Sequence, residues 1–467
     1  MATKKVFEHL EKMGHRPIEL ERGSMSFKIW KKIKIKRVRV PDILCVNCGK
    51  RIESRGKTKL EITMSHSFAA QERGWDFGLD PEDFVALIKC TRAGDRPIDW
   101  DAEEPIQYIS VSSMKTAFKN GHAISEKPKG ATEGFEARIT WPSSLASATG
   151  KVVSVDENKL QYRRKLDNRL ITLRLKKKNI KLKPLVKLND ELSENQIVAS
   201  VVPVSQVFDC GKRAKEEYYE KALISASISD RYAAAKVLHL FPSKSTARIL
   251  LTRMNDTKEH IYIRLEAASS LLKMGYKEPL SFFQEILEDQ YLENRLEAVI
   301  ILGEIRNEIA LNLLTKTLLD ANQHPEIRAG SAWSLGELKN KKALNALVRV
   351  FNEVEGSIRI EAARAVAKLG EKFSREIIEF LSHSNEEERA GLAWALSKSG
   401  TFKVQDVIPA MTDNEARKWV AWIVGTQNEA AYIDQIEQMR DRDKEVYFAV
   451  TVLWKIMSSW IEGLDIY

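Results

Sequence analysis

An arginine recurs along the second half of the chain at nearly constant spacing. Successive members are separated by 33, 31, 33, 31, 30 and 28 residues, and three of them open the same pattern of Arg, an apolar residue, Glu and Ala. A period of this length is typical of helix-turn-helix units that stack into a solenoid. The pattern therefore predicts about seven or eight helix pairs over residues 212–467. The recurring residues are Arg231, Arg264, Arg295, Arg328, Arg359, Arg389 and Arg417.

A unit of about thirty residues, with an Arg opening its second helix and an alanine-rich inner face, resembles HEAT repeats of the short, PBS-lyase-like kind. The resemblance implies an α-solenoid. We expect each Arg to pair with acidic residues of a neighbouring unit and so form a ladder, with a phosphate-binding row as the alternative. Six tryptophans are expected to pack between helices, with an aromatic surface that grips a partner as the alternative. They are Trp333, Trp394, Trp419, Trp422, Trp454 and Trp460.

The excess of positive charge lies entirely in the first part of the chain. Residues 1–210 contain 39 Lys and Arg against 27 Asp and Glu, whereas residues 211–467 contain 35 against 38. This division predicts a nucleic-acid-facing module attached to a neutral scaffold that contacts a protein partner. The alternative is a solvated basic surface without a ligand.

Residues 1–125 alternate between short helical and strand patterns. We expect a helix over residues 6–13, strands over 18–22 and 33–40, and a partner strand that continues through Ile52, Ser54 and residues 60–64. A helix that opens at Asp80 and runs to Ile88 and a strand over 106–111 should follow. Residues 126–134 have few large apolar side chains, which is typical of a linker.

This order, with Pro41-Asp42 ending one strand and Glu53 on the next, resembles the PD-(D/E)xK nuclease superfamily and its restriction-endonuclease-like core. The resemblance implies that Asp42 and Glu53 bind Mg²⁺ or Mn²⁺ and that Glu8 supports them. Arg55 occupies the position expected for the catalytic Lys, and an Arg cannot accept a proton. We therefore assign the catalytic amine to Lys57, and Arg55 to contact with the phosphate. The alternatives are a hairpin with surface charges and a degenerate nuclease that binds without cutting.

Cys45-Val-Asn-Cys48-Gly49 looks like half of a zinc ribbon. No second CxxC follows, so a complete site would need His66 and Cys90, whose separations match no familiar spacing. Buried cysteines beside a tight turn are the favoured interpretation, and structural zinc is the alternative.

Residues 135–205 show a period of two, which predicts a small all-β module. Its expected strands lie at 137–141, 150–155, 160–162 and 170–175, and the segment 184–199 resembles the hairpin of barrel-sandwich hybrid domains. The module is strongly basic, with Tyr162 interleaved. We expect it to bind a nucleic-acid backbone, with a solvated edge as the alternative. The predicted contacts are Arg163, Arg164, Lys165, Arg169, Lys176, Lys177 and Lys178, together with Arg55.

The sequence therefore predicts a multidomain α+β protein: a nuclease-like α/β domain, a basic β module and a HEAT solenoid. We expect a cytoplasmic protein with no membrane partner, because no apolar run approaches the length that crosses a bilayer and no secretion signal is present. The leading functional hypothesis is a metal-dependent nuclease acting on DNA rather than RNA, in antiviral defence. A non-catalytic nucleic-acid-binding adaptor is the alternative, and a protein-only scaffold would leave the basic first half unexplained.

Overall fold

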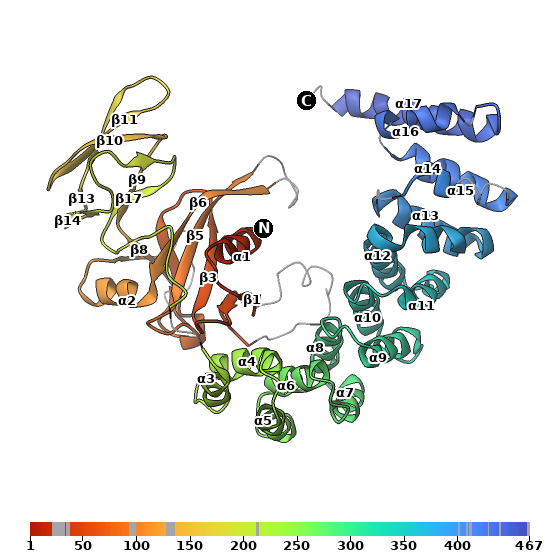
Figure 1. Cartoon of the computed structure of the whole chain (residues 1–467), viewed down its shortest axis with the longest axis horizontal. Coiled ribbons are helices and arrows are strands. Elements are labelled where there is room, and N and C mark those ends of the chain that lie inside the picture. The colour runs from red at the N-terminus through yellow and green to blue at the C-terminus, as the bar shows by residue number, and fades with distance from the viewer. Residues whose placement is uncertain are drawn as a thin grey trace. The chain divides into compact units, whose positions relative to one another are not determined.

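The computed structural model describes residues 1–20, 33, 38–92, 100–127, 136–211, 214–399, 402–407, 410, 413–427, 429–438 and 440–464 (Figure 1). The chain forms two compact units, one reaching Ile249 and the other starting at Leu250. Within the described ranges, no helix has the length and apolar character needed to cross a membrane.

The first unit is built on a mixed five-stranded sheet. β2 and β3 form an antiparallel hairpin, β3 lies parallel to β5, and β6 is antiparallel to β5. Helix α1 (Ala2–Lys12) buries Val6 and Leu10 against one face of this sheet, as its amphipathic spacing predicts. The strands in sheet order are β1 (Pro17–Glu19), β2 (Ile43–Cys45), β3 (Arg51–Lys57), β5 (Phe84–Arg92) and β6 (Trp100–Ser110).

The predicted helix from Asp80 to Ile88 is wrong, because strand β5 begins at Phe84. Ala86 packs in the core beneath α1, and its neighbour Leu87 packs in the core on the opposite face. A strand buried on both faces has a continuous apolar sequence, which lacks the alternation that distinguishes a strand from a helix. The connection from β3 to β5 contains a strand, β4 (Ile62–Ser67), and a short 3₁₀ helix, η2 (Gln71–Arg73), instead of an α-helix.

Of the other elements predicted in this region, some are confirmed and others lie partly on residues that form no strand or that are not described. The helix at 6–13 and the strand at 106–111 are confirmed by α1 and β6. The strand predicted at 18–22 appears as β1, and residues 21–22 lie outside the described part. Of the strand predicted at 33–40, residues 38–40 have no strand structure and 34–37 are not described. Residues 128–134 of the predicted linker also lie outside the described chain.

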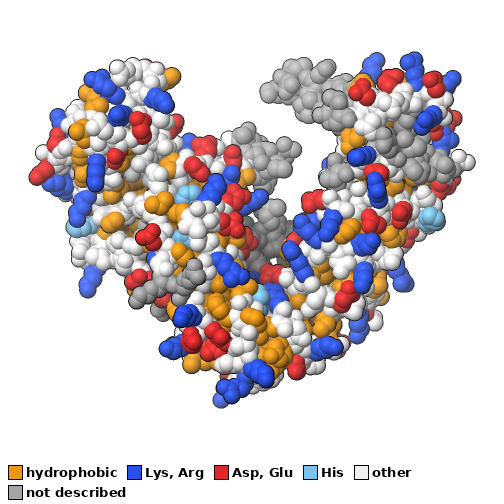
Figure 2. All heavy atoms as spheres, viewed as in Figure 1, with side chains coloured by type: hydrophobic (Ala, Val, Ile, Leu, Met, Phe, Trp, Pro, Cys, Tyr) orange, Lys and Arg blue, Asp and Glu red, His pale blue; other side chains and the backbone are white. Residues whose placement is uncertain are grey.

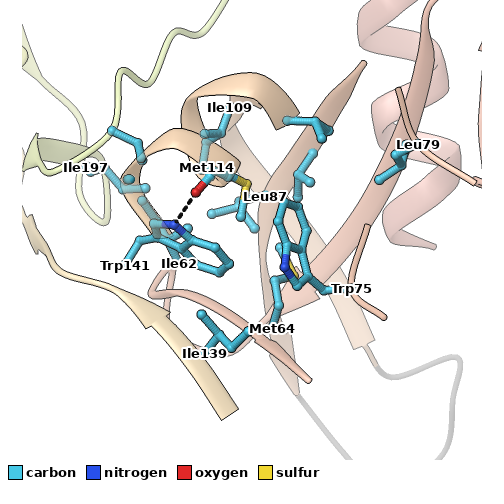
Figure 3. Packing of buried hydrophobic residues seen from close by; sticks show 14 of the residues in the cluster. Ile62, Met64, Trp75, Leu79, Leu87, Ile109, Met114, Ile139, Trp141 and Ile197 are labelled. Atoms are coloured by element: carbon cyan, nitrogen blue, oxygen red, sulfur yellow. Dashed lines mark hydrogen bonds between the residues drawn. The ribbon is translucent and has the colours of Figure 1, made fainter. Parts of the chain in front are cut away.

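A second sheet closes the other face of the first one. Its core contains Trp75 and Trp141, whose rings meet edge to face with centroids 5.2 Å apart (Figure 3). The Trp141 indole N–H donates to the carbonyl of Met114 at 3.0 Å. Residues 136–141, predicted within the β module, therefore share a sheet and a core with the N-terminal region. The sheet order is β4 (Ile62–Ser67), β8 (Glu136–Trp141) and β7 (Ile124–Glu126), with α2 (Val111–Lys119) packed against it.

Residues 143–200 form the β module. The predicted strands at 150–155, 160–162 and 170–175 are confirmed. Tyr162 does not interleave with the basic side chains: it is buried, and its hydroxyl accepts the Ser147 N–H at 2.9 Å. The strands are β9 (Ser143–Leu145), β10 (Gly150–Val155), β11 (Lys159–Arg164), β12 (Leu170–Arg174), β13 (Lys176–Lys177), β14 (Ile180–Lys181), β15 (Lys183–Pro184), β16 (Glu191–Leu192) and β17 (Ile197–Ser200).

The remainder of the chain is helical, as predicted. A long helix, α12, bends at Phe373, where the backbone leaves the helical conformation. The helices are α3 (Glu216–Ala222), α4 (Ile228–Val237), α5 (Lys244–Asn255), α6 (Ile261–Lys273), α7 (Pro279–Leu287), α8 (Leu292–Leu302), α9 (Glu308–Leu319), α10 (Pro325–Glu337), α11 (Leu344–Arg349), α12 (Gly356–His383), α13 (Glu386–Ser399), α14 (Val404–Val407), α15 (Asn414–Gly425), α16 (Glu429–Glu437) and α17 (Lys444–Leu464).

The recurring arginines form the predicted ladder at three positions. Arg328 pairs with Glu353 at 2.6 Å, Arg389 with Asp413 at 2.6 Å and Arg417 with Asp443 at 2.8 Å, each acid lying just before the next stacked helix. Arg328 and Arg389 also donate through Nε to the carbonyls of Leu318 and Leu381 at the end of the preceding helix. These guanidinium groups are thus held by the array itself.

Three further recurring arginines form no ion pair of this kind in the described structure: Arg264, Arg295 and Arg359 have other surroundings. Arg295 reaches Gln323 at 2.9 Å instead of an acid. Arg264 donates to the Met254 carbonyl at 2.8 Å and lies over the Phe282 ring. Arg359, in contrast, is exposed.

Candidate nucleic-acid interface

Asp42 and Glu53 are brought together at the start of the β2–β3 hairpin. The register of β2 against β3 places Asp42 beside Glu53. Asp42 Oδ2 accepts the backbone N–H of Ser54 at 2.7 Å, and Glu53 Oε1 pairs with Arg55 Nη2 at 2.6 Å. Both carboxylates, and the predicted phosphate contact Arg55, therefore have partners within β3.

Lys57 shares the strand face of Glu53 but lies away from it. Four residues of extended strand span about 13 Å. Lys57 Nζ donates to the carbonyl oxygen and the hydroxyl of Thr63 at 2.7 and 3.0 Å. Burial, with smaller contributions from Arg55 and Arg138, lowers the pKa of Lys57. The amine is therefore held at a cavity of about 430 Å³ near β4 rather than beside the two carboxylates.

Glu8 lies on α1, which packs on the face of the sheet opposite to that of Glu53. Its carboxylate forms an i,i+4 ion pair with Lys4 at 4.0 Å. The structure therefore separates Glu8 from the other three predicted catalytic residues.

The exposed face of the β10–β11–β12 sheet carries four basic side chains, which we call the basic face: Lys151, Lys159, Arg163 and Arg174. The alternate residues of β11, including Leu160, point into the core of the module. Across the strands, Lys151 lies directly opposite Arg163, and Lys159 lies directly opposite Arg174. On the neighbouring β13–β14 hairpin, Lys176 likewise lies opposite Lys181.

Like charges that face each other across an antiparallel pair are destabilising, because their Cβ atoms are only about 4.5–5.5 Å apart. Two carboxylates of the module pair away from this face, Asp167 with Arg164 and Glu157 with Lys181 at 3.0 Å, and Glu126 of β7 pairs with Lys178 at 2.5 Å. Glu191 of β16 lies directly opposite Lys151 on the other side of β10, so Lys151 has one basic and one acidic cross-strand neighbour. The opposed cations of the basic face add a cross-strand repulsion that Glu191 offsets in part at Lys151 and that a bound polyanion would relieve further. Figure 2 shows Lys and Arg side chains on the visible face of this module, with acidic side chains among them.

The predicted basic residues divide into three groups. Arg163 lies on the basic face. Arg164 pairs with Asp167, Lys178 pairs with Glu126, and Lys177 Nζ donates to the Ser143 carbonyl. The third group is exposed elsewhere on the module and consists of Lys165, Arg169 and Lys176.

Lys151 and Lys159 were missed by the sequence prediction. Alternation along β11 would have placed Lys159 on the face of Arg163, since the two are four residues apart. Lys151 needed the strand register, which the sequence does not reveal.

Cys45 and Cys48 lie in a cluster with His15 and Cys210, whose ligand atoms are all within 4.8 Å of one another. His15 Nδ1 is 3.4 Å from Cys45 Sγ and 3.9 Å from Cys48 Sγ, and the Cys45 and Cys210 sulfurs are 3.8 Å apart. The Cys48 thiol lowers the pKa of Cys45 by donating a hydrogen bond to its thiolate.

His66 and Cys90, the partners considered from the sequence, lie elsewhere. His66 Nδ1 accepts the Trp75 N–H at 3.4 Å, and Cys90 lies against Gly56 on the neighbouring strand. His15 and Cys210 were missed because they are 30 and 165 residues from Cys45 in the sequence.

The comparisons with known proteins concern the helical array. Residues 280–367 match the model of HEAT repeats, so this part of the array consists of HEAT repeats. A search of curated proteins finds no match. Among solved structures, the chain is similar to the CpcE–CpcF complex of phycocyanin lyase from Nostoc, with 17% identity over 52% of this chain and 94% of that one, and a TM-score of 0.25. Human deoxyhypusine hydroxylase shows 15% identity over 45% and 83%, with a TM-score of 0.20. These low scores carry no argument about function.

Proposed function

We propose that the protein is a nucleic-acid-binding adaptor, in which the β module binds the phosphate backbone and the HEAT array binds a protein. The observation that supports it is the pair of opposed cations on each side of β11: Lys151 with Arg163 and Lys159 with Arg174. Like charges that face each other on an exposed sheet face repel each other, and an anionic ligand bound across them would relieve this repulsion.

A duplex backbone suits this face better than separated bases. Binding of single strands relies on aromatic side chains on which bases stack. The four side chains of the basic face are Lys and Arg, and Tyr162 is buried beneath them. We therefore expect binding with little sequence preference and a steep dependence on salt, with duplex DNA as the first ligand to test.

The test replaces all four residues of the basic face by Ala and measures binding to labelled duplex DNA by fluorescence anisotropy over a series of salt concentrations. Each lost phosphate contact should reduce the slope of log K against log salt by about 0.9. A matched control replaces four exposed lysines of the array, Lys258, Lys277, Lys398 and Lys403, which removes the same charge. If both variants lose the same DNA affinity, the loss follows from net charge alone, and the assignment of DNA binding to the basic face is wrong.

Three half-buried tryptophans support the array as the protein-binding part. Trp333, Trp394 and Trp422 each stand five residues after a ladder arginine, on α10, α13 and α15. Trp454 is buried, as predicted for a core residue, but these three retain exposed surface. Tryptophans that are partly exposed at equivalent positions of stacked repeats are suited to anchoring a partner. Trp460 lies where side chains are not described.

The corresponding test captures binding proteins with the full chain and with the triple variant Trp333→Ala, Trp394→Ala and Trp422→Ala. Tyr291→Ala, which removes an exposed aromatic side chain from α8's start, is the control. A partner that is lost with the triple variant and kept with the control supports the proposal. A partner retained by both variants would refute the role of the tryptophans.

Metal-dependent cleavage of DNA is the second candidate, favoured by the adjacency of Asp42 and Glu53. The pair fits Mg²⁺ poorly, because Arg55 already places a positive charge on Glu53 and Lys57 is bonded to Thr63. Incubation of linear and circular DNA with Mg²⁺, Mn²⁺ or chelator tests it. If the wild-type chain cleaves DNA and Glu53→Gln does not, the nuclease becomes the better supported of the two functions.

A further inference from the structure

We propose that His15, Cys45, Cys48 and Cys210 together bind one structural Zn²⁺ ion. This proposal does not depend on the proposed function. The four residues come from three segments: the turn after α1, the β2–β3 hairpin and the chain that leads from the β module to α3. One imidazole and three thiols are the donor set that Zn²⁺ prefers in closed tetrahedral sites.

The spacing of the donor atoms fits a single ion. Zn–S bonds of about 2.3 Å and a Zn–N bond of about 2.1 Å in a tetrahedron place donors roughly 3.6–3.8 Å apart. The separations of 3.4 Å between His15 Nδ1 and Cys45 Sγ, 3.9 Å between His15 Nδ1 and Cys48 Sγ, and 3.8 Å between the Cys45 and Cys210 sulfurs agree with this value.

The surroundings also orient the donors. His15 Nε2 lies 3.1 Å from the Phe208 carbonyl oxygen, so the proton of the neutral ring belongs on Nε2 and the lone pair of Nδ1 faces the sulfurs. Ligand histidines characteristically donate their second N–H in this way. The ring is held by Phe208, whose centroid lies 4.6 Å away.

The hairpin has the form of a metal-binding knuckle. Gly49 adopts a φ of +74°, which favours glycine, and its N–H donates to the Cys45 carbonyl at 2.8 Å. Backbone N–H groups of Arg16 and Cys48 are directed at Cys45 Sγ, and that of Lys50 at Cys48 Sγ. N–H donors around a sulfur stabilise the thiolate form that a metal requires.

With four protein donors the site has no open position, so the zinc would be structural rather than catalytic. It would fix the segment around Cys210 against the hairpin, where Tyr219 of α3 already donates its hydroxyl to the Val46 carbonyl at 2.8 Å. The competing chemistry for two sulfurs 3.8 Å apart is a Cys45–Cys210 disulfide.

The first experiment measures the metal content of the full chain, purified without chelator, by inductively coupled plasma mass spectrometry. We expect one zinc per chain in the wild type. Cys210→Ser and His15→Ala should retain less than about a tenth of it. Cys90→Ser and His66→Ala are matched controls outside the cluster and should keep their zinc. Full retention by both cluster variants would overturn the proposal.

The second experiment needs no variant, so it remains decisive if the substituted chains fail to fold. Zinc is replaced by Co²⁺ in the wild-type chain, and its absorption is recorded. Intense ligand-field bands and sulfur-to-cobalt charge transfer would indicate a tetrahedral site with thiolates. Weak octahedral bands, or a Cys45–Cys210 disulfide found by mass spectrometry of the chain purified under reducing conditions, would contradict the proposal.

Discussion

The arginines of the helical array and the cations of the basic face are both repeated basic residues, but their surroundings are opposite. Arg328 lies between a backbone carbonyl and Glu353, and its side chain is 6% exposed. Lys159 is exposed and faces Arg174. Positive charge therefore stabilises the fold in the array, whereas on the basic face like charges oppose each other across the strands at the exposed surface.

The largest effect is expected from the ladder. Arg328→Ala removes a hydrogen bond to the Leu318 carbonyl and an ion pair with the partly exposed Glu353. Hydrogen bonds of charged groups contribute about 1.5–3 kcal/mol, so the free energy of unfolding of the array should fall by about 2–3 kcal/mol. Urea unfolding followed by circular dichroism measures it. Arg359→Ala, at the equivalent exposed position, should change stability by less than about 0.5 kcal/mol. Equal effects would remove the distinction between the two arginines.

An intermediate effect is expected at Asp42, whose carboxylate accepts the Ser54 N–H. Asp42→Ala leaves this donor without an acceptor and should cost about 1–2 kcal/mol of unfolding free energy. Asp42→Asn keeps a carbonyl oxygen there and should recover most of the loss, with DNA binding unchanged in both variants. If Asp42 is a metal ligand instead, Asn will not rescue and DNA cleavage will disappear in both.

The smallest expected change in stability is a gain, whereas the two preceding variants lose stability. Lys159→Glu replaces a repulsive pair with an attractive one across from Arg174, and should stabilise the ligand-free protein by about 0.2–1 kcal/mol. The same change should weaken DNA binding. The gain in thermal stability should shrink as salt is added, because salt screens exposed charges. Lys187→Glu, at an exposed position of the same module, should lack the gain; a similar gain there would point to net charge alone.

The array was the part most open to sequence prediction, because each repeat is local and its period spans only about thirty residues. Arg328, Arg389 and Arg417 were assigned correctly on that basis. Strand β5 was assigned to a helix because both of its faces are buried, which the sequence does not show. The prediction also could not anticipate that β8 would pair with β4.

The candidate sites depend on long-range pairing and were predicted only in fragments. Cys45 and Cys48 were found from their local spacing, but Cys210 joins them across 165 residues. Lys57 was placed on the correct strand face, yet its bond to Thr63 depends on how β4 turns back. In both cases the residue types identified candidate site residues, but which residues lie in contact depends on the tertiary fold.

The segment after the β module has a consequence for synthesis. Phe208 stacks on Phe84 with centroids 4.2 Å apart, and Ser205 exchanges backbone hydrogen bonds with Tyr108 of β6 at 2.7 and 3.0 Å. On a ribosome, the first 125 residues emerge before the segment that completes their core. At about 5–20 residues per second the delay is roughly 4–16 s. During that interval the part of the core that Phe208 covers would stay exposed, so an apolar surface would be open to aggregation until the segment arrives.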